Sequence, residues 1–234
     1  KPEEEESKKW YEYWKSQRIE WYKNLGINES NLRFRQHEED ERAHYAQDAW
    51  DIEYNLDGEW KEFEGVHHRG DWDIKQHMEH SGEDFRYTNP ETHDKYLPWI
   101  IETSGGVDRA ALFFLIDAYE EDNENNRTVL KLHPKLAPYK VAVFPLLANK
   151  PELVEKAKEV YNNLKEKWMT DWDARGNIGK RYRYQDEIGT PFCITYDFDS
   201  LEDNAVTVRD RDTMKQDRVK IEELENYLTK KLNG

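Results

Sequence analysis

The chain has 234 residues, of which 36% are hydrophobic and 36% are charged, and its formal net charge is −15. Nine Trp, 14 Tyr and 8 Phe are enough for a substantial hydrophobic core in one large or two ordinary domains, which excludes an intrinsically disordered chain. No apolar run approaches the roughly 20 residues that span a bilayer, so a transmembrane helix is excluded and no membrane partner is expected.

The N-terminal residues and the only cysteine indicate the cellular compartment. The first residues, KPEEEESKK, contain no apolar h-region and no initiating Met, so we expect no signal peptide and a chain that starts inside a longer protein. Cys193 has no partner for an internal disulfide and lies in an apolar, strand-like run. We predict a buried thiol in a protein of the reducing cytoplasm.

Negative charge is distributed unevenly along the chain. Residues 137–234 hold 17 Lys and Arg against 18 Asp and Glu, and the preceding residues hold the other 18 basic and 32 acidic residues. The C-terminal part is therefore nearly neutral, and it is the likelier of the two to contact RNA.

The first predicted element is an amphipathic helix over residues 8–25. Trp10, Trp14, Trp21 and Leu25 repeat at helical spacing, and Gly26 follows in the position of a C-terminal cap. We predict that the tryptophans pack in the core or in an interface and do not form a ligand platform.

A hairpin and a second helix are predicted next. Residues 51–68 form two alternating segments around Asp57-Gly58, the dipeptide of a tight β-turn. A polar helix from Asp71 to Ser81 then leads through a loop with Pro and Asn to an apolar strand.

The strand enters a Gly-Gly turn within YLPWIIETSGGVDRAALFFLIDAY, residues 96–119, and a helix follows with Asp108 and Arg109 in its first turn. Two glycines allow close approach to a ligand, and the free N–H groups of a helix start attract anions such as phosphates. Arginine adds a planar donor fork suited to phosphate oxygens. The alternative is a tight connection that binds nothing.

Composition changes at RTVLKLHPKLAPYKVAVFPLL, and we place a domain boundary near residue 136, giving domains 1–136 and 137–234. The second domain is predicted to contain strand 141–147, helix 151–168, a loop with glycines, strands 190–198 and 205–211 around a turn at Asp203-Asn204, and helix 221–232. This alternation is typical of a compact α/β domain with a mixed sheet.

Two kinds of segment are candidates for RNA or metal binding. Residues 180–184, KRYRY, interleave basic and aromatic side chains in a way that suits single-stranded RNA, and the alternative is a strand with one packed and one charged face. His67-His68 and the segment 77–80, HMEH, lack zinc-protease spacing, and one cysteine gives no sulfur cluster. We therefore expect no zinc and no metal site made by protein ligands alone.

Several segments resemble bacterial-type glycyl-tRNA synthetase, in the order of that family. They are LRFRQHEEDERAHYAQDAWDIEY, EWKEFEGVHHRGDWDIKQHMEHSGEDF, the class II motif-3 stretch ETSGGVDR, LKLHPKLAPYKVAVFPLL and GKRYRYQDEIGTPFCITYDFDSLEDNAVTVRDRDTMKQDRV. The resemblance implies an α/β (α+β) fold: the C-terminal part of a class II antiparallel-sheet catalytic domain, followed by an α/β anticodon-binding domain with a mixed sheet.

The resemblance also implies an activity: glycine and ATP form glycyl-adenylate, and the glycyl group passes to tRNA(Gly). It makes Arg109 and Glu62 the catalytic residues, with Arg109 on the ATP phosphates. Glu62, Phe63, Gly106, Val107, Asp108 and Arg109 would bind ATP, which carries Mg²⁺, and Glu62 would help to hold that ion. Lys180, Arg181 and Arg183 would bind tRNA.

The glycine pocket implied by the resemblance runs through Glu102, Thr103, Ser104, Gly105 and Gly106. Glu102 and Ser104 would recognise the substrate ammonium. Thr103 stands where the family usually has Pro, which removes a fixed φ from the pocket wall.

The family's motif 1, at the homodimer interface, and motif 2, with its α-phosphate arginine, lie upstream of anything in this sequence. We therefore expect a fragment, a portion of a longer chain, or a subunit that needs a separate N-terminal half for activity. The competing hypotheses are a non-catalytic, synthetase-derived tRNA- or RNA-binding accessory module and a purely structural subunit.

Overall fold

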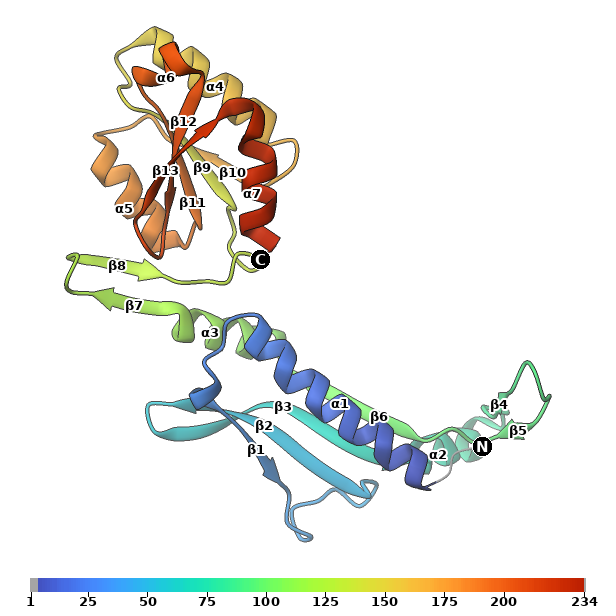
Figure 1. Ribbon diagram of the computed structural model, residues 1–234. Coiled ribbons are helices and arrows are strands. Elements are labelled where there is room, and N and C mark those ends of the chain that lie inside the picture. The colour runs from blue at the N-terminus through green and yellow to red at the C-terminus, as the bar shows by residue number, and fades with distance from the viewer. Residues whose placement is uncertain (1–3, 234) are drawn as a thin grey trace. The chain divides into compact units, whose positions relative to one another are not determined.

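The computed structural model describes residues 4–233, and the chain folds as two compact units that divide between Phe113 and Phe114 (Figure 1). Unit 1 contains the residues up to Phe113, and unit 2 those from Phe114 onward. Among residues 4–233, no helix combines the length and the hydropathy needed to cross a bilayer.

Unit 1 is built on a four-stranded antiparallel sheet in the order β1-β2-β3-β6. Its strands are β1 (Leu32–Gln36), β2 (Asp48–Leu56), β3 (Glu59–Gly70) and β6 (Ile100–Gly105). The predicted hairpin is confirmed: Asp57 and Gly58 both have positive φ, 51° and 88°, as a two-residue turn between twisted strands requires.

Helix α1 (Glu4–Asn24) lies along one face of this sheet (Figure 1). The helix prediction is confirmed, and Gly26 takes a positive φ of 100° just past its end. Of the two predicted roles for the tryptophans, packing in the core is excluded, because Trp10, Trp14 and Trp21 are 42–48% exposed, and packing in an interface stays a prediction. The buried side of α1 carries instead Tyr11, Lys15 and Tyr22, together with Ser7.

The rest of unit 1 connects and flanks the sheet. A 3₁₀ turn η1 (Glu29–Asn31) precedes β1, and α2 (Trp72–Ser81) follows β3 with Gly82 in the left-handed conformation at its C-terminus, which confirms the predicted polar helix. A small hairpin, β4 (Tyr87–Thr88) and β5 (Lys95–Tyr96), precedes β6, and α3 (Val107–Ala118) follows β6 and continues past Phe113 into unit 2.

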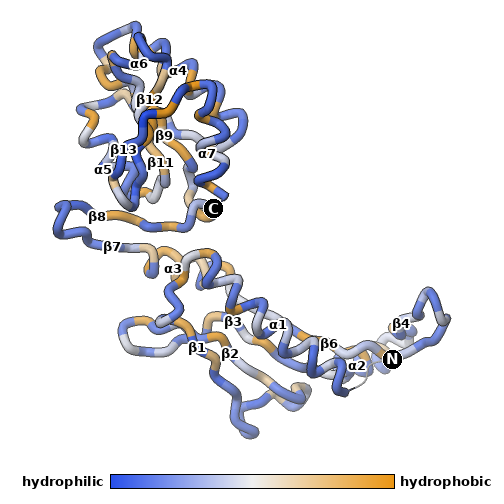
Figure 2. The backbone as a smooth tube through the Cα atoms, in the orientation of Figure 1, coloured by the Kyte–Doolittle hydropathy of each residue, from blue (hydrophilic) through white to orange (hydrophobic). Residues whose placement is uncertain are grey.

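Unit 2 has a five-stranded mixed sheet in the order β10-β9-β11-β12-β13, which confirms the predicted α/β architecture. Its strands are β9 (Val141–Pro145), β10 (Thr170–Trp172), β11 (Phe192–Tyr196), β12 (Ala205–Asp210) and β13 (Gln216–Lys220). The β10-β9-β11 pairs are parallel, and β12 and β13 are antiparallel additions. Figure 2 shows hydrophobic residues along the central strands.

Helices cover both faces of that sheet. Helices α4 (Pro151–Leu164) and α7 (Leu224–Asn233) bury Leu153 and Leu228 in the larger core. Helix α5 (Ile178–Ile188) packs Ile178 and Tyr182 against Ala142, Phe144 and Cys193 on the other face. The short elements α6 (Asp199–Asp203) and η2 (Ile221–Glu223) lie before β12 and α7.

Unit 2 contains several elements that the sequence pattern does not predict, among them β10, α5 and β13. Residues 178–188 form α5 in place of the expected loop, and β13 adds an edge strand to the sheet. The predicted burial of Cys193 is confirmed, and this burial raises the pKa of its thiol, so the side chain behaves as a small hydrophobe.

Unit 2 also includes a hairpin of β7 (Tyr119–Asp122) and β8 (Arg127–Leu130). The buried guanidinium of Arg127 lies 3.0 Å from Asp186 and donates to the Arg211 carbonyl at 2.7 Å. Asp186 also accepts from Arg209 at 2.7 Å. This charged core ties the hairpin to α5 and β12, so the compact unit begins well before residue 136.

Candidate functional site

The predicted strand, Gly-Gly turn and helix are present as β6, Gly105-Gly106 and α3. Neither glycine has a positive φ. A Cβ on Gly106 would come no closer than 3.6 Å to another atom, and one on Gly105 no closer than 3.5 Å, which is ordinary van der Waals contact. The fold itself would accommodate a Cβ at either position, so packing within the chain does not explain the two glycines.

The structure brings Arg109 of α3 beside Glu62 of β3. The Arg109 Nη1 donates to the Glu62 carbonyl at 2.9 Å and lies 4.0 Å from its carboxylate. Both side chains are more than half exposed, and Val107, at the start of α3, is 81% exposed. With Asp108 they form an open wall with an oriented cation and a carboxylate at a helix start, which suits a nucleotide carrying a hard divalent cation.

The β2–β3 pairing has an irregularity directly after Glu62. Glu62 pairs with Glu53 and Glu64 pairs with Ile52, so Phe63 is an extra residue of the bulge type. The Phe63 ring packs 4.0 Å from that of Tyr22 of α1 and is 1% exposed. Its side chain is therefore part of the core, and it can serve the candidate site only by holding Glu62 in place or through its backbone.

Glu64 anchors the α1 side of the same bulge. Its carboxylate accepts from Arg18 at 2.6 and 2.9 Å and from the Tyr22 hydroxyl at 2.5 Å, and the side chain is 2% exposed. Burial and the adjacent carboxylate raise the pKa of Tyr22 well above its usual range, which keeps the hydroxyl protonated as a donor. This buried network fixes α1 to β3 beneath the Gly-Gly turn.

The predicted amine-binding residues, Glu102 and Ser104, lie on the face of the unit 1 sheet that is turned away from α1. In the β3–β6 register Glu102 pairs with His67, Thr103 with Val66 and Ser104 with Gly65. Because strand residues alternate, Glu102 and Ser104 share the face away from α1, and Thr103 points to the α1 side. The structure thus brings the two predicted ammonium ligands onto one face of β6, whereas the Thr103 side chain is directed to the other face.

Arg69 and Asp73 are parts of this surface that sequence reasoning missed. Arg69 Nη1 donates to the Glu102 carboxylate, and its Nε and Nη2 donate to Asp73 at 2.8 and 2.6 Å. The paired guanidinium lowers the pKa of Asp73, so its carboxylate is ionised near neutral pH. An open groove of about 480 Å³ is lined by these three residues with His77, Ile100, Ile101 and Thr103.

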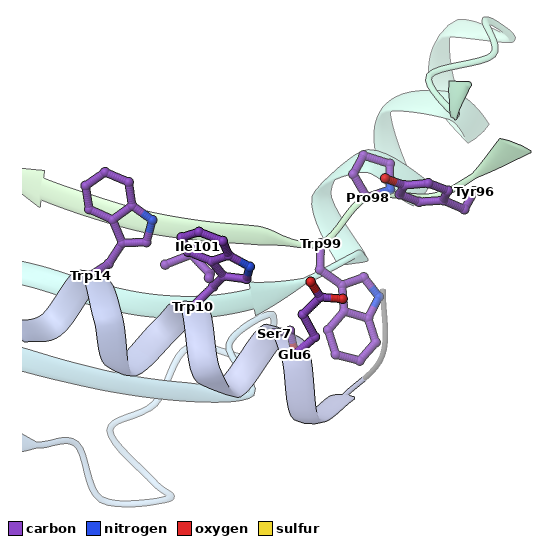
Figure 3. Close-up of a pocket in the computed structure, with 8 residues that line it drawn as sticks. All are labelled: Glu6, Ser7, Trp10, Trp14, Tyr96, Pro98, Trp99 and Ile101. Carbon is purple, nitrogen blue, oxygen red and sulfur yellow. The ribbon is translucent and has the colours of Figure 1, made fainter. Parts of the chain in front are cut away.

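A second groove, of about 410 Å³, lies between α1 and residues 96–101 (Figure 3). Trp10 and Trp14 project from α1 beside Ile101 of β6, and Trp99, Tyr96 and Pro98 close the other end. None of its lining residues belongs to the predicted ATP or glycine set. The sequence prediction of an interface role for the tryptophans remains open, although their core role is excluded.

The predicted RNA-binding residues lie on α5. Arg181 is 2% exposed and donates to the carbonyls of Arg175 and Gly176 at 2.9 and 3.0 Å, so it is a structural cation of the helix start and not an available RNA ligand. Tyr182 is also turned inward, with its hydroxyl 2.6 Å from Thr195 Oγ1. Lys180 and Arg183 remain exposed, as does Tyr184.

Comparisons with known proteins identify the class of protein that shares this fold. A crystal structure of prolyl-tRNA synthetase from Cryptosporidium parvum, complexed with L-proline and AMP, matches the fold with a TM-score of 0.70 at 19% identity, over 98% of this chain and 47% of that one. Residues 140–231 match the anticodon binding domain family. The chain therefore has the fold of a class II aminoacyl-tRNA synthetase, ending in an anticodon binding domain.

The sequence comparison is more specific. The chain is 53% identical over 230 residues to the glycine–tRNA ligase of Alkaliphilus oremlandii and 52% identical over 227 residues to that of Staphylococcus haemolyticus. These alignments cover 97% and 95% of this chain but 49% and 48% of the relatives, so the chain spans about half the length of the curated relatives it matches. It is homologous to that half of glycine–tRNA ligase, as the sequence motifs indicated.

Proposed function

We propose that the chain is part of a glycine–tRNA ligase, which uses ATP to form glycyl-adenylate and transfers the glycyl group to tRNA(Gly). The observation that carries this proposal is the homology over 97% of the chain. The aligned region includes the Arg109–Glu62 pair and the surface formed by Glu102 and Ser104, which lie around the strand, turn and helix formed by β6, Gly105-Gly106 and α3. A homodimer in the cytoplasm is the corresponding proposal for the complete protein.

In this proposal Arg109 binds the ATP phosphates at the start of α3. Its bond to the Glu62 carbonyl holds the guanidinium at the wall without using all five of its donors. Glu62 supplies a hard carboxylate oxygen for the Mg²⁺ that accompanies ATP. Gly106, Val107 and Asp108 form the backbone wall that the phosphates approach. Charge stabilisation and positioning are the main requirements of this step, because no covalent enzyme intermediate is needed.

Glu102 and Ser104 bind the ammonium of glycine on the adjacent surface. Arg69 shares the Glu102 carboxylate and is itself held by Asp73, so it fixes the direction in which Glu102 can accept another cation. Gly105 and Gly106 leave the small space that a substrate without a side chain can fill. In unit 2, Lys180 and Arg183 contact tRNA phosphates, with Tyr184 available for stacking on a base.

Glycine-dependent ATP–pyrophosphate exchange tests the proposal. The chain is assayed alone and as a chimera in which it replaces the matching half of the Alkaliphilus oremlandii enzyme. We expect exchange in the chimera, and a loss of at least about 100-fold in Arg109→Ala, because one lost electrostatic contact to a reacting group costs about 10²–10³ in rate. Arg86→Ala is the matched control, since Arg86 is exposed and its side chain pairs, among residues 4–233, with Asp84.

The two classes of function give different results. A folded chimera that binds tRNA(Gly) but gives no exchange would replace this proposal with the accessory-module hypothesis. Equal exchange in Arg109→Ala and Arg86→Ala would remove Arg109 from the phosphate site and leave the ligase assignment standing.

A further inference from the structure

Two histidines, His37 just after the end of β1 and His67 in β3, meet on the sheet face opposite α1. The His37 N–H donates to the Ala49 carbonyl at 3.0 Å, and Ala49 pairs with His67 in the β2–β3 register. His37 and His67 therefore flank the small side chain of Ala49, and their ring centroids are 5.7 Å apart. Asp51 lies two residues along β2, on the same face.

A glycine beneath His67 makes room for its ring. Gly65 pairs with Asp51, and a Cβ built on Gly65 would lie 3.0 Å from His67 Nε2, which is tighter than most real Cβ contacts. The His67 ring thus occupies the space above Gly65 and leans toward Asp51. Ala49 and Gly65 together form a cradle for two imidazoles and one carboxylate.

The three side chains present their donor atoms to one another. One ring nitrogen of each histidine and one oxygen of Asp51 all lie within 4.8 Å of one another, and His37 Nε2 is 2.8 Å from Asp51 Oδ2. Asp51 is 6% exposed. His67 Nε2 is buried and has no hydrogen-bond partner among residues 4–233. A buried polar nitrogen without a partner is costly, and a bound cation would satisfy it.

In contrast to the expectation from sequence spacing that there is no zinc site, we propose that His37, Asp51 and His67 form a binding site for a divalent transition-metal ion of the Zn²⁺ type. Imidazole nitrogen and carboxylate oxygen are its usual protein ligands, and three protein ligands leave a fourth position open. Ligand atoms about 2.0–2.1 Å from a tetrahedral ion are about 3.3 Å apart, which is compatible with one measured separation of 2.8 Å and with ligand atoms that all lie within 4.8 Å of one another. Small side-chain rotations would therefore bring the three ligand atoms to this spacing.

The site is connected to the proposed glycine pocket. His67 Nδ1 lies 3.9 Å from the Glu102 carboxylate. A histidine that binds metal through Nε2 carries its proton on Nδ1 and commonly directs it at a carboxylate. Metal binding would then draw Glu102 toward His67 and weaken its bond to the substrate ammonium, a consequence that rests on the proposed function. The metal site itself does not depend on that function.

Metal binding is measured on the 234-residue chain without substrates. The metal-free protein is titrated with Zn²⁺ against a chromophoric chelator, and Co²⁺ is used as a spectroscopic probe of coordination. We expect one Zn²⁺ per chain, visible Co²⁺ bands of a four- or five-coordinate site, and at least a 10-fold weaker affinity in His67→Ala. His80→Ala is the matched control, because His80 is an exposed histidine of α2 outside the cluster. The Zn²⁺ affinity of this variant should stay within 2-fold of that of the unchanged protein.

Asp51→Asn keeps the shape of the carboxylate and gives a second variant in case His67→Ala alters the fold. Loss of the Co²⁺ bands in Asp51→Asn with unchanged circular dichroism would support the site. Equal Zn²⁺ affinity in His67→Ala, Asp51→Asn and His80→Ala, or the absence of stoichiometric binding, would overturn the proposal and leave a hydrogen-bonded cluster. Neither outcome bears on pyrophosphate exchange, so the two proposals can fail separately.

Discussion

Glycine at position 106 is not required by the fold. Its φ is not positive, and the nearest atom to a Cβ at this position is 3.6 Å away. Gly106→Ala should therefore leave the free energy of unfolding unchanged or raise it by about 0.4–1 kcal/mol, because alanine reduces the entropy of the unfolded chain. In the chimera described above, the same change should lower pyrophosphate exchange by at least about 10-fold, because the methyl group enters the space proposed for ATP and glycine.

Gly189 provides the contrasting control for Gly106. It has a φ of 84°, and a Cβ there would lie 2.9 Å from the Leu130 carbonyl, so Gly189→Ala should destabilise the protein in urea unfolding. If Gly106→Ala unfolds as easily as Gly189→Ala, the glycine is structural and the ligand argument for it is wrong.

For individual side chains, the motif resemblance grouped residues that the structure also brings together, and their roles at the site stay predictions. Arg109 and Glu62 are 47 residues apart in sequence, and the motif resemblance placed both on ATP; the structure brings them into contact. Burial was harder to predict. Phe63 and Arg181 alternate with charged or aromatic neighbours, and such patterns do not say which side faces the core when a bulge or a helix replaces a regular strand.

Helix α5 illustrates the same limit for a whole element. Its sequence, IGKRYRYQDEI, contains Gly and two Tyr, which are poor or indifferent helix formers, and no apolar stripe marks its buried side. The signals present were at its ends: Asn177 Oδ1 accepts the Lys180 N–H at 2.9 Å, and Gly189 adopts the left-handed conformation after the last turn.

These end signals predict a measurable contribution to stability. Asn177→Ala removes the acceptor at the start of α5 and should lower the free energy of unfolding of unit 2 by about 1 kcal/mol. Asn162→Ala is the control, because Asn162 is exposed within α4, where alanine is the better helix former. Urea unfolding followed by circular dichroism measures both, and equal midpoints would show that the cap does not stabilise α5.

Helix α1 was predicted as an element but not in its orientation. Trp10, Trp14 and Trp21 form one aromatic stripe, and Tyr11 and Tyr22 belong to another that is rotated by one residue. Periodicity alone cannot choose between two aromatic stripes. The choice depends on tertiary partners, since the Tyr11 hydroxyl donates to the Val66 carbonyl at 2.8 Å and Tyr22 donates to Glu64.

At the scale of the whole molecule, the sequence indicated two regions of different charge and an α/β second domain. The mixed sheet agrees with this, because strands that alternate with helices leave a clear pattern in sequence. The extent of unit 2 could not be predicted from composition. It depends on Asp186, Arg127 and Arg209, which are far apart in sequence and become one buried charge cluster only after folding.

The charge distribution leads to a prediction about tRNA. The chain as a whole carries −15, so attraction to RNA must come from local cations such as Lys180 and Arg183 on α5. The double variant Lys180→Ala/Arg183→Ala should weaken binding of a tRNA(Gly) transcript by about 10-fold and reduce the slope of log K against log[salt] by about 2, one for each phosphate contact. Filter binding between low and moderate salt measures both quantities.

The control for this prediction removes the same number of positive charges at a different place in unit 2. Lys230 and Lys231 lie on α7, which packs on the other face of the unit 2 sheet. The double variant Lys230→Ala/Lys231→Ala should therefore bind tRNA(Gly) with the affinity and salt slope of the unchanged protein. If both double variants weaken binding equally, the effect comes from total charge, because a localised contact would distinguish α5 from α7. That result would remove the proposed role of α5 as the tRNA-binding helix.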